Sequence, residues 1–285
     1  MSKNSLHSDD AAAAARWQDT QVDLTGGHAT TLRIYRQAHA TGDALVVHFH
    51  GGAYVSGSLD SGATVAGLLA DAGATVVSVD YPLARQQPFP AAVEVGHAAL
   101  VWADGQRAVL AGRKARLFVA GEEAGGNLAT AVAMMARDRR VPALAGQILV
   151  SPMLDARVGT ASMREGKGGP SGCRWADGWC AYLSCGAAAD HPYALPARAL
   201  RLGGMPPALL LSADDDPLRD ETLAYARRLE ECGTPARCRV LDMATGWPCA
   251  LSAANTDRAG WADAVRDAMR EFLTQGPPAK SRQTP

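Results

Sequence analysis

The sequence predicts an α/β fold, in which a mostly parallel central sheet carries helices on both of its faces. Apolar runs of strand length recur along the chain, and Ala-rich stretches of helical character separate them. Two of these stretches stop at Gly, as helices with a left-handed C-cap do. Buried strands that alternate with helices over roughly 200 residues are typical of a parallel sheet covered on both sides.

The elements follow one another in a simple order. Two strands around 21–27 and 30–37 would form an antiparallel edge of the sheet. Six buried strands are expected at 44–50, 74–81, 115–121, 145–151, 208–213 and 236–242, which makes eight strands in all. Helices are expected over 64–73, 91–112, 125–140 and 221–233.

One domain of 285 residues is predicted, long enough to bury a substantial core. We expect its polar ends, residues 1–20 and 276–285, to be loose. Residues 156–200 break the alternation, because Gly, Ala and Pro interrupt every period, and Trp175, Trp179 and Tyr182 cluster there. A long irregular insertion of this kind usually covers a site, so we interpret it as a small lid.

Composition excludes several classes of partner. Lys plus Arg number 28 against 29 Asp plus Glu, so no net field would attract nucleic acid or an anionic membrane. The apolar runs fall far short of the roughly 20 residues that span a bilayer, and the first residues lack the order of a signal peptide. The six cysteines contain no Cys-x-x-Cys pair and are expected to be reduced thiols. The sequence therefore predicts a cytoplasmic protein.

A glycine turn follows directly on the strand that ends at Phe49. Its backbone amides would face the C-terminal edge of the sheet, which is the layout of an oxyanion hole. Taken alone, the turn is equally typical of a plain strand-to-loop connection that uses Gly for its conformational freedom. The turn consists of His50, Gly51, Gly52, Ala53 and Tyr54.

Six motifs in order carry a resemblance to a known family. They are HGGAY at 50–54, DYPLARQQPFPAA at 80–92, GEEAGGNLA at 121–129, SPMLD at 151–155, MPPALL at 205–210 and DPLRDE at 216–221. With them the chain closely resembles the hormone-sensitive-lipase-like branch of the α/β-hydrolases over roughly residues 40–275. The resemblance implies the α/β-hydrolase fold and descent from carboxylic ester hydrolases, which need no cofactor.

The family's catalytic triad is incomplete in this sequence. Members present a nucleophilic serine in a Gly-Asp-Ser-Ala-Gly-Gly elbow, and an Asp of Asp-Pro-Leu orients a histidine base. Carried over by position, the serine falls on Glu123, the aspartate on Asp216 and the histidine on Thr245. Without the hydroxyl nucleophile and the base, ordinary serine esterase activity should be weak or absent. The resemblance also assigns an oxyanion hole to Gly51, Gly52, Ala53 and Ala124, and a ligand pocket to Tyr54, Trp175, Trp179, Tyr182 and Trp247.

Glu123 leaves three interpretations open. It would start a helix whose dipole favours negative charge, so its carboxylate could turn to the neighbouring amides and plug the oxyanion hole. Alternatively it could act as a general acid or base. Attack by the carboxylate itself ranks lowest, since no histidine would activate water against the covalent ester. In the plugged arrangement we expect the hydroxyl of Thr245 to lie within reach of Asp216, which lacks its histidine.

The sequence is consistent with three different functions. The leading hypothesis is a pseudo-hydrolase that binds a small apolar or acyl-bearing ligand, as the gibberellin receptors do among relatives lacking the family histidine. The rivals are an active non-serine enzyme, either hydrolase, lyase or isomerase, that uses Glu123 with the oxyanion hole, and a non-catalytic partner of an active paralogue. The sequence does not decide between a monomer and a homodimer. No metal site is expected, because the run Asp214, Asp215, Asp216 has no accompanying ligand pattern.

Overall fold

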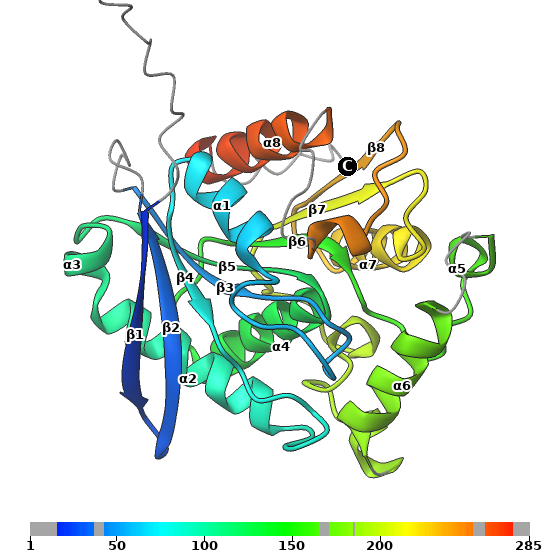
Figure 1. The fold of residues 1–285 in the computed structure, drawn as a ribbon, viewed down its shortest axis with the longest axis horizontal. Coiled ribbons are helices and arrows are strands. Elements are labelled where there is room, and N and C mark those ends of the chain that lie inside the picture. The colour runs from blue at the N-terminus through cyan, green and yellow to red at the C-terminus, as the bar shows by residue number, and fades with distance from the viewer. Residues whose placement is uncertain (1–15, 37–42, 166–170, 185, 253–259, 276–285) are drawn as a thin grey trace, which may run out of the picture.

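An eight-stranded sheet forms the centre of the fold (Figure 1). The computed structural model describes residues 16–36, 43–165, 171–184, 186–252 and 260–275. The strands lie in the order β1-β2-β4-β3-β5-β6-β7-β8; the pairs β1–β2 and β2–β4 are antiparallel, and all the other neighbours are parallel. Their bounds are β1 Arg16–Leu24, β2 His28–Arg36, β3 Ala44–Phe49, β4 Thr75–Val79, β5 Arg116–Glu123, β6 Gly146–Pro152, β7 Ala208–Ala213 and β8 Ala236–Leu241. The predicted α/β architecture is confirmed.

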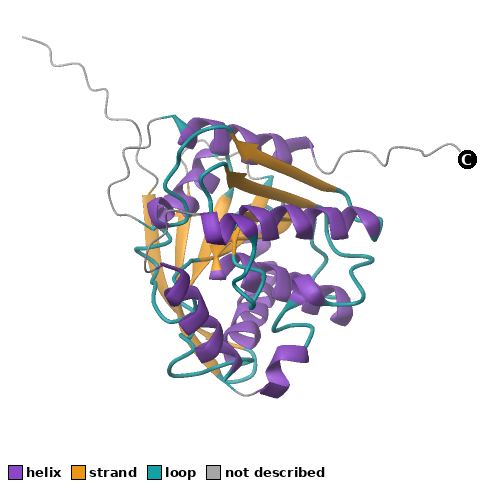
Figure 2. Cartoon of the chain, turned by 90° about the vertical axis from the view of Figure 1, so that its right-hand side faces the viewer, coloured by secondary structure: helices purple, strands orange, loops and turns teal. Residues whose placement is uncertain are grey.

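Helices cover both faces of this sheet, as Figures 1 and 2 show. Successive residues of a strand point to opposite faces, and β3 follows that rule: Val47 and Phe49 join one apolar cluster, whereas Val46 joins the other. The first cluster includes residues of α2, α4 and α7, and the second includes residues of α1 and α8. The bounds are α1 Ala63–Asp71, α2 Ala91–Gly105, α3 Arg107–Leu110, α4 Ala124–Arg139, α7 Arg219–Glu231 and α8 Trp261–Gln275.

The structure differs from the expected elements in a few places. The helix expected over 91–112 is broken at Gln106 into α2 and α3. Residues 16–20, expected to be loose, belong to β1, where they pair with β2; residues 1–15 and 276–285 lie outside the described residues. The insertion at 156–200 is more regular than expected, since it contains α5 Ala161–Glu165, α6 Ser171–Leu183, and the 3₁₀ turns η1 Gly186–Asp190 and η2 Pro196–Arg198.

No helix within the described ranges combines the length and the apolar character needed to cross a bilayer.

The two residues that precede the insertion are held in place by a buried carboxylate of α7. Glu221 accepts hydrogen bonds from the amides of Leu154 and Asp155, at 3.2 and 2.7 Å. Burial raises the pKa of Glu221 well above its ordinary value of 4.5, and the charges of Asp155 and Asp216 raise it further, against the effect of the two amides. The folded protein therefore holds this proton more tightly than the unfolded chain does.

We expect Glu221→Gln to reduce the free energy of unfolding by about 1–3 kcal/mol at pH 7, because an amide group cannot accept from both backbone donors. A raised folded pKa adds stability at low pH that is lost as the pH rises through that pKa. The glutamine cannot titrate. The difference between wild type and variant should therefore be larger at pH 5 than at pH 7 in urea unfolding, and a larger difference at pH 7 would contradict this account.

Candidate functional site

The glycine turn after β3 is held in place by a buried carboxylate of β5. Glu122 accepts the amide N–H of Gly51 on Oε1 at 2.9 Å. Its Oε2 lies 2.7 Å from Nε2 of His48, whose Nδ1 lies 2.5 Å from Oγ of Ser78. All three side chains are buried. This network was not predicted, although the position of Glu122 beside the elbow residue was visible in the motif GEEAGG.

The histidine of the turn has a structural role. His50 donates from Nδ1 to the carbonyl oxygen of Gly51 at 2.7 Å, and its ring stacks on Tyr81 with centroids 4.3 Å apart. Burial lowers the pKa of His50 to about 4, so the imidazole is neutral at physiological pH. Tyr81 in turn donates its hydroxyl to the carbonyl oxygen of His50 at 2.7 Å. These contacts fix the conformation of the turn.

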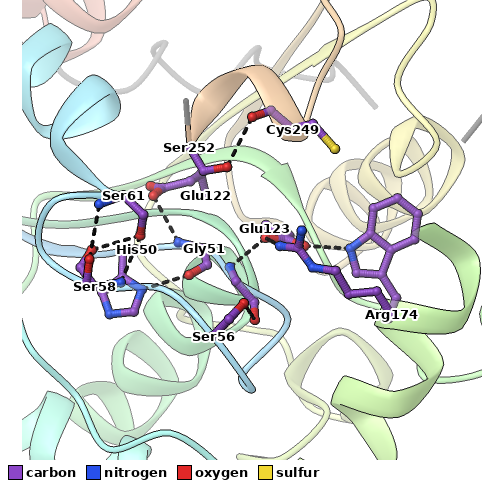
Figure 3. A network of polar contacts seen from close by, with 12 residues as sticks. His50, Gly51, Ser56, Ser58, Ser61, Glu122, Glu123, Arg174, Cys249 and Ser252 are labelled. Carbon is purple, nitrogen blue, oxygen red and sulfur yellow. Dashed lines mark hydrogen bonds and ion pairs between the residues drawn. The ribbon is translucent and has the colours of Figure 1, made fainter. Parts of the chain in front are cut away.

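Glu123 stands at the junction of β5 and α4 with a backbone φ of 51° and ψ of −119°. Its carboxylate turns toward the glycine turn: Oε2 accepts the amide N–H of Gly52 at 2.6 Å (Figure 3). Oε1 accepts the indole N–H of Trp175 at 2.6 Å, and the guanidinium of Arg174 lies 3.3 Å from both oxygens. Only 4% of Glu123 is exposed. The expected turn of this side chain toward the amides is therefore observed.

The four residues assigned to the oxyanion hole have different surroundings. The amide of Gly52 is occupied by Glu123, whereas the amide of Gly51 is occupied by Glu122. Ala53 and Ala124 are fully buried beside the turn, and neither amide donates to Glu123 in the described structure. Gly51 therefore serves the structure of the turn and does not present the free donor that the sequence predicted. Gly52 is the donor that meets the elbow residue.

The aspartate carried over from the family triad is buried and accepts hydrogen bonds from three donors. Asp216 accepts from the hydroxyls of Ser151 and Ser212, at 2.9 and 2.7 Å, and from the amide of Leu218 at 2.9 Å. Burial raises the pKa of Asp216, against the effect of these donors, and the neighbouring charge of Asp215 raises it further. Three donors from three segments therefore fix the position of the Asp216 carboxylate.

The expected contact between Thr245 and Asp216 is wrong. The Thr245 hydroxyl donates to Oδ1 of Asp215 at 3.0 Å, and its amide lies 2.9 Å from both oxygens of the same carboxylate. The amide of Gly246 donates to Asp215 at 2.8 Å as well. The physical reason is that Asp216 already has its donors, while Asp215 faces the loop after β8 and accepts three of its polar hydrogens.

The aromatic residues predicted to line a ligand pocket fall into two groups. Tyr54 and Tyr182 stack with centroids 3.8 Å apart, and Trp179 lies 5.9 and 6.0 Å from their rings. All three are at most 2% exposed, so they pack on one another between the turn and α6. Trp175 and Trp247 instead lie on the wall of a cavity of about 500 Å³. The structure thus leaves space beside Asp216, whereas the rings of Tyr54, Trp179 and Tyr182 pack on one another and line no part of that cavity.

Comparisons with known proteins agree with this geometry. The sequence pattern of the alpha/beta hydrolase fold matches residues 46–245. The chain is similar to an arylesterase of Saccharolobus solfataricus, with 35% identity over 72% of this chain and 68% of the relative. It is also similar to the carboxylesterase NlhH of Mycobacterium tuberculosis, with 38% identity over 66% of this chain and 61% of the relative's length. The solved structure of esterase LipW from Mycobacterium marinum superposes with a TM-score of 0.79 at 32% identity, covering 93% of this chain and 83% of that one.

Proposed function

The chain belongs to the α/β-hydrolase family, in its hormone-sensitive-lipase-like esterase branch, and from that membership we propose that it is a pseudo-hydrolase, which binds a small molecule and does not hydrolyse esters by the serine mechanism. The observation that carries the proposal is the 2.6 Å contact between Oε2 of Glu123 and the amide of Gly52. A carboxylate oxygen there takes a donor that an esterase keeps for the oxyanion of its tetrahedral intermediate.

The missing groups support the same conclusion. Acyl transfer by a serine hydrolase needs a hydroxyl nucleophile and a base that first takes its proton and later protonates the leaving group. Glu123 supplies no hydroxyl, and Thr245 has no imidazole. An acid-base role for Glu123 is disfavoured, because both of its oxygens already accept hydrogen bonds from fixed donors of the turn and of α6. We therefore favour a ligand-binding function over a catalytic one.

Binding is favoured over a purely structural role by the surviving cavity of about 500 Å³. It lies at the carboxyl ends of β7 and β8, and such edges of parallel sheets are where α/β proteins bind ligands. Its volume falls in the range of about 300–1,000 Å³ that small-molecule sites occupy. Trp175 belongs both to the cavity wall and to the contacts of Glu123, so a ligand there would touch the elbow region.

We expect the purified protein to show no covalent labelling by a fluorophosphonate probe and negligible turnover of p-nitrophenyl acetate. Any residual hydrolysis should stay within the roughly 10³–10⁴-fold acceleration over water that binding and an oxyanion hole supply without a triad. An active serine esterase of the family, treated in parallel, serves as the positive control. Stoichiometric labelling mapped to a serine near the elbow, such as Ser151, would overturn the proposed function.

A further inference from the structure

The carboxylate of Glu123 lies between two segments that are far apart in the sequence. One is the glycine turn after β3, whose Gly52 amide donates to Oε2 at 2.6 Å. The other is α6 of the insertion, whose Trp175 indole N–H donates to Oε1 at 2.6 Å and whose Arg174 guanidinium lies 3.3 Å from both oxygens. Figure 3 shows Arg174 beside Glu123. We call these three donors the carboxylate site.

The carboxylate site selects a group with two acceptor oxygens and a negative charge. A backbone amide and an indole N–H can only donate, and the guanidinium adds a positive charge. Gly52 and Trp175 each take a different oxygen of Glu123, and both hydrogen bonds are short, as bonds to an ionised acceptor are. A neutral amide group would turn its own N–H toward one of the two donors. The site therefore fits a carboxylate better than its neutral isostere.

One face of α6 packs against the glycine turn. Buried positions recur every three or four residues along the helix, which places them on one side of it. A Cβ atom built on Gly178 would lie 2.1 Å from the carbonyl oxygen of Ala53, so the backbones of helix and turn touch at that point. Glu123 is almost wholly buried between the two segments. The buried positions are Trp175, Gly178, Trp179 and Tyr182, whereas Ala176, Asp177 and Cys180 are exposed.

The two halves of α6 are attached to the domain in different ways. The second half is held by the packing of its aromatic rings around Tyr54 and by the amide of Phe89, which donates to the carbonyl oxygen of Tyr182 at 2.9 Å. In the first half, every hydrogen bond and ion pair that the described side chains from Arg174 to Gly178 form outside the helix ends on Glu123. The first half therefore depends on that one carboxylate for its polar attachment.

We propose that the glycine turn and α6 form a carboxylate-binding site, which the chain fills with its own Glu123, and that this occupancy holds the first half of α6 against the turn. Glu123 is then a positioning residue for the lid. Trp175 also lies on the wall of the cavity of about 500 Å³, so the same contact fixes that wall. The inference goes beyond the proposed function, because it depends neither on the loss of esterase activity nor on the ligand that the cavity takes.

Removing the side chain of Glu123 should release the first half of α6, and formate should restore it. Glu123→Gly leaves room for a free carboxylate, and glycine accepts the φ of 51° found at this position. We expect the protection of the amides from Arg174 to Gly178 against hydrogen exchange to fall at least about tenfold, and to return to within about threefold of wild type in about 100 mM sodium formate. Half-saturation should lie in the millimolar range, because a ligand of so few atoms cannot bind much more tightly.

Matched controls separate this site from a general loss of stability. Sodium chloride at the same concentration and formamide, a neutral molecule of the same size as formate, should restore no protection in Glu123→Gly. Formate should leave the wild type unchanged, because Glu123 already fills the site. Asp177→Asn removes an exposed carboxylate from the same half of α6 and should keep full protection. The amides of the second half of α6 and of α8 should change by less than about twofold in every variant.

A second variant keeps the test decisive if Glu123→Gly does not fold. Trp175→Phe retains Glu123 and an aromatic ring but removes the indole donor, so protection of the first half of α6 should fall at least about threefold, and formate should have no effect. Unchanged protection of α6 in the folded variants, an equal loss in α8, or equal restoration of Glu123→Gly by formate and chloride would overturn the inference. Fluorophosphonate labelling of a serine would overturn the proposed function instead and would leave these exchange results unchanged.

Discussion

Glu123→Ser combined with Thr245→His should convert this protein into a measurable esterase, whereas Glu123→Ser alone should stay at the background of the parent. The serine would restore the nucleophile and, because its side chain is short, would release the amide of Gly52 for an oxyanion. Without a base, however, the serine keeps its proton, and the members of a triad act as one unit whose effects are not additive.

The contacts of Asp215 and Asp216 determine how large a gain in kcat/KM we expect from the added histidine. Ser151, Ser212 and the amide of Leu218 fix the orientation of Asp216, and its Oδ2 accepts only from Ser212 among the described residues, so that oxygen keeps a lone pair for a histidine N–H. The backbone amides of 245 and 246 stay bound to Asp215 in the variant, since only the side-chain contact of Thr245 is lost. We expect kcat/KM on p-nitrophenyl acetate to exceed that of Glu123→Ser by at least about 10²-fold, the lower end of what a positioned base contributes.

The triple variant that adds Asp216→Asn is the matched control. It keeps the serine and the imidazole but removes the carboxylate that orients the base, so most of the gain should disappear. If the double variant is as inert as the parent, the site has diverged beyond these two positions. The first explanation to test would then be a change in the position of α6, because Arg174 and Trp175 of that helix both lose their acceptor in the serine variant.

Much of the fold could be predicted because the strands are buried on both faces. The runs at 44–50 and 208–213 are apolar except for His48, His50 and Ser212, and they match β3 and β7, which are buried throughout, to within one residue. The turn of Glu123 toward Gly52 was also predictable, since backbone donors at a helix start attract a carboxylate that local geometry already places beside them. α8 was missed, although its apolar residues recur every three or four positions from Trp261 to Leu273.

The details of the site depend on contacts between strands that sequence spacing does not reveal. Asp215 and Asp216 are adjacent, and only the turn after β7 decides which carboxylate meets Thr245 and which meets Ser151 of the neighbouring strand. Arg174 belongs to an insertion that was expected to be irregular but forms a helix above the elbow, and its ion pair with Glu123 follows from that helix. A carboxylate next to its donors can be predicted, but a partner from a distant segment cannot.

The glycines of the elbow fix the backbone conformation around Glu123. A Cβ atom built on Gly125 would lie 2.0 Å from the carbonyl oxygen of Phe49 and 2.5 Å from that of His50. A Cβ on Gly121 would lie 2.2 Å from the carbonyl oxygen of Gly125. The start of α4 therefore packs backbone to backbone against the ends of β3 and β5. This close approach places Glu123 in its left-handed conformation whether or not chemistry takes place there.

Gly125→Ala should accordingly be among the most damaging single substitutions in the chain. The atoms that its methyl group would meet belong to the backbone of β3, so neither β3 nor α4 can yield without disturbing the central sheet. We expect the free energy of unfolding to fall by about 4 kcal/mol or more, a loss that only a few mechanisms produce, and the Tm to fall by roughly 10 °C. Gly105→Ala is the matched control, because a Cβ there meets nothing within 4 Å at the exposed end of α2, and alanine favours a helix over glycine by up to about 1 kcal/mol. Circular dichroism melts of the two variants decide the question: if both are as stable as wild type, the elbow is not held by this contact, and the strain at Glu123 must have another source.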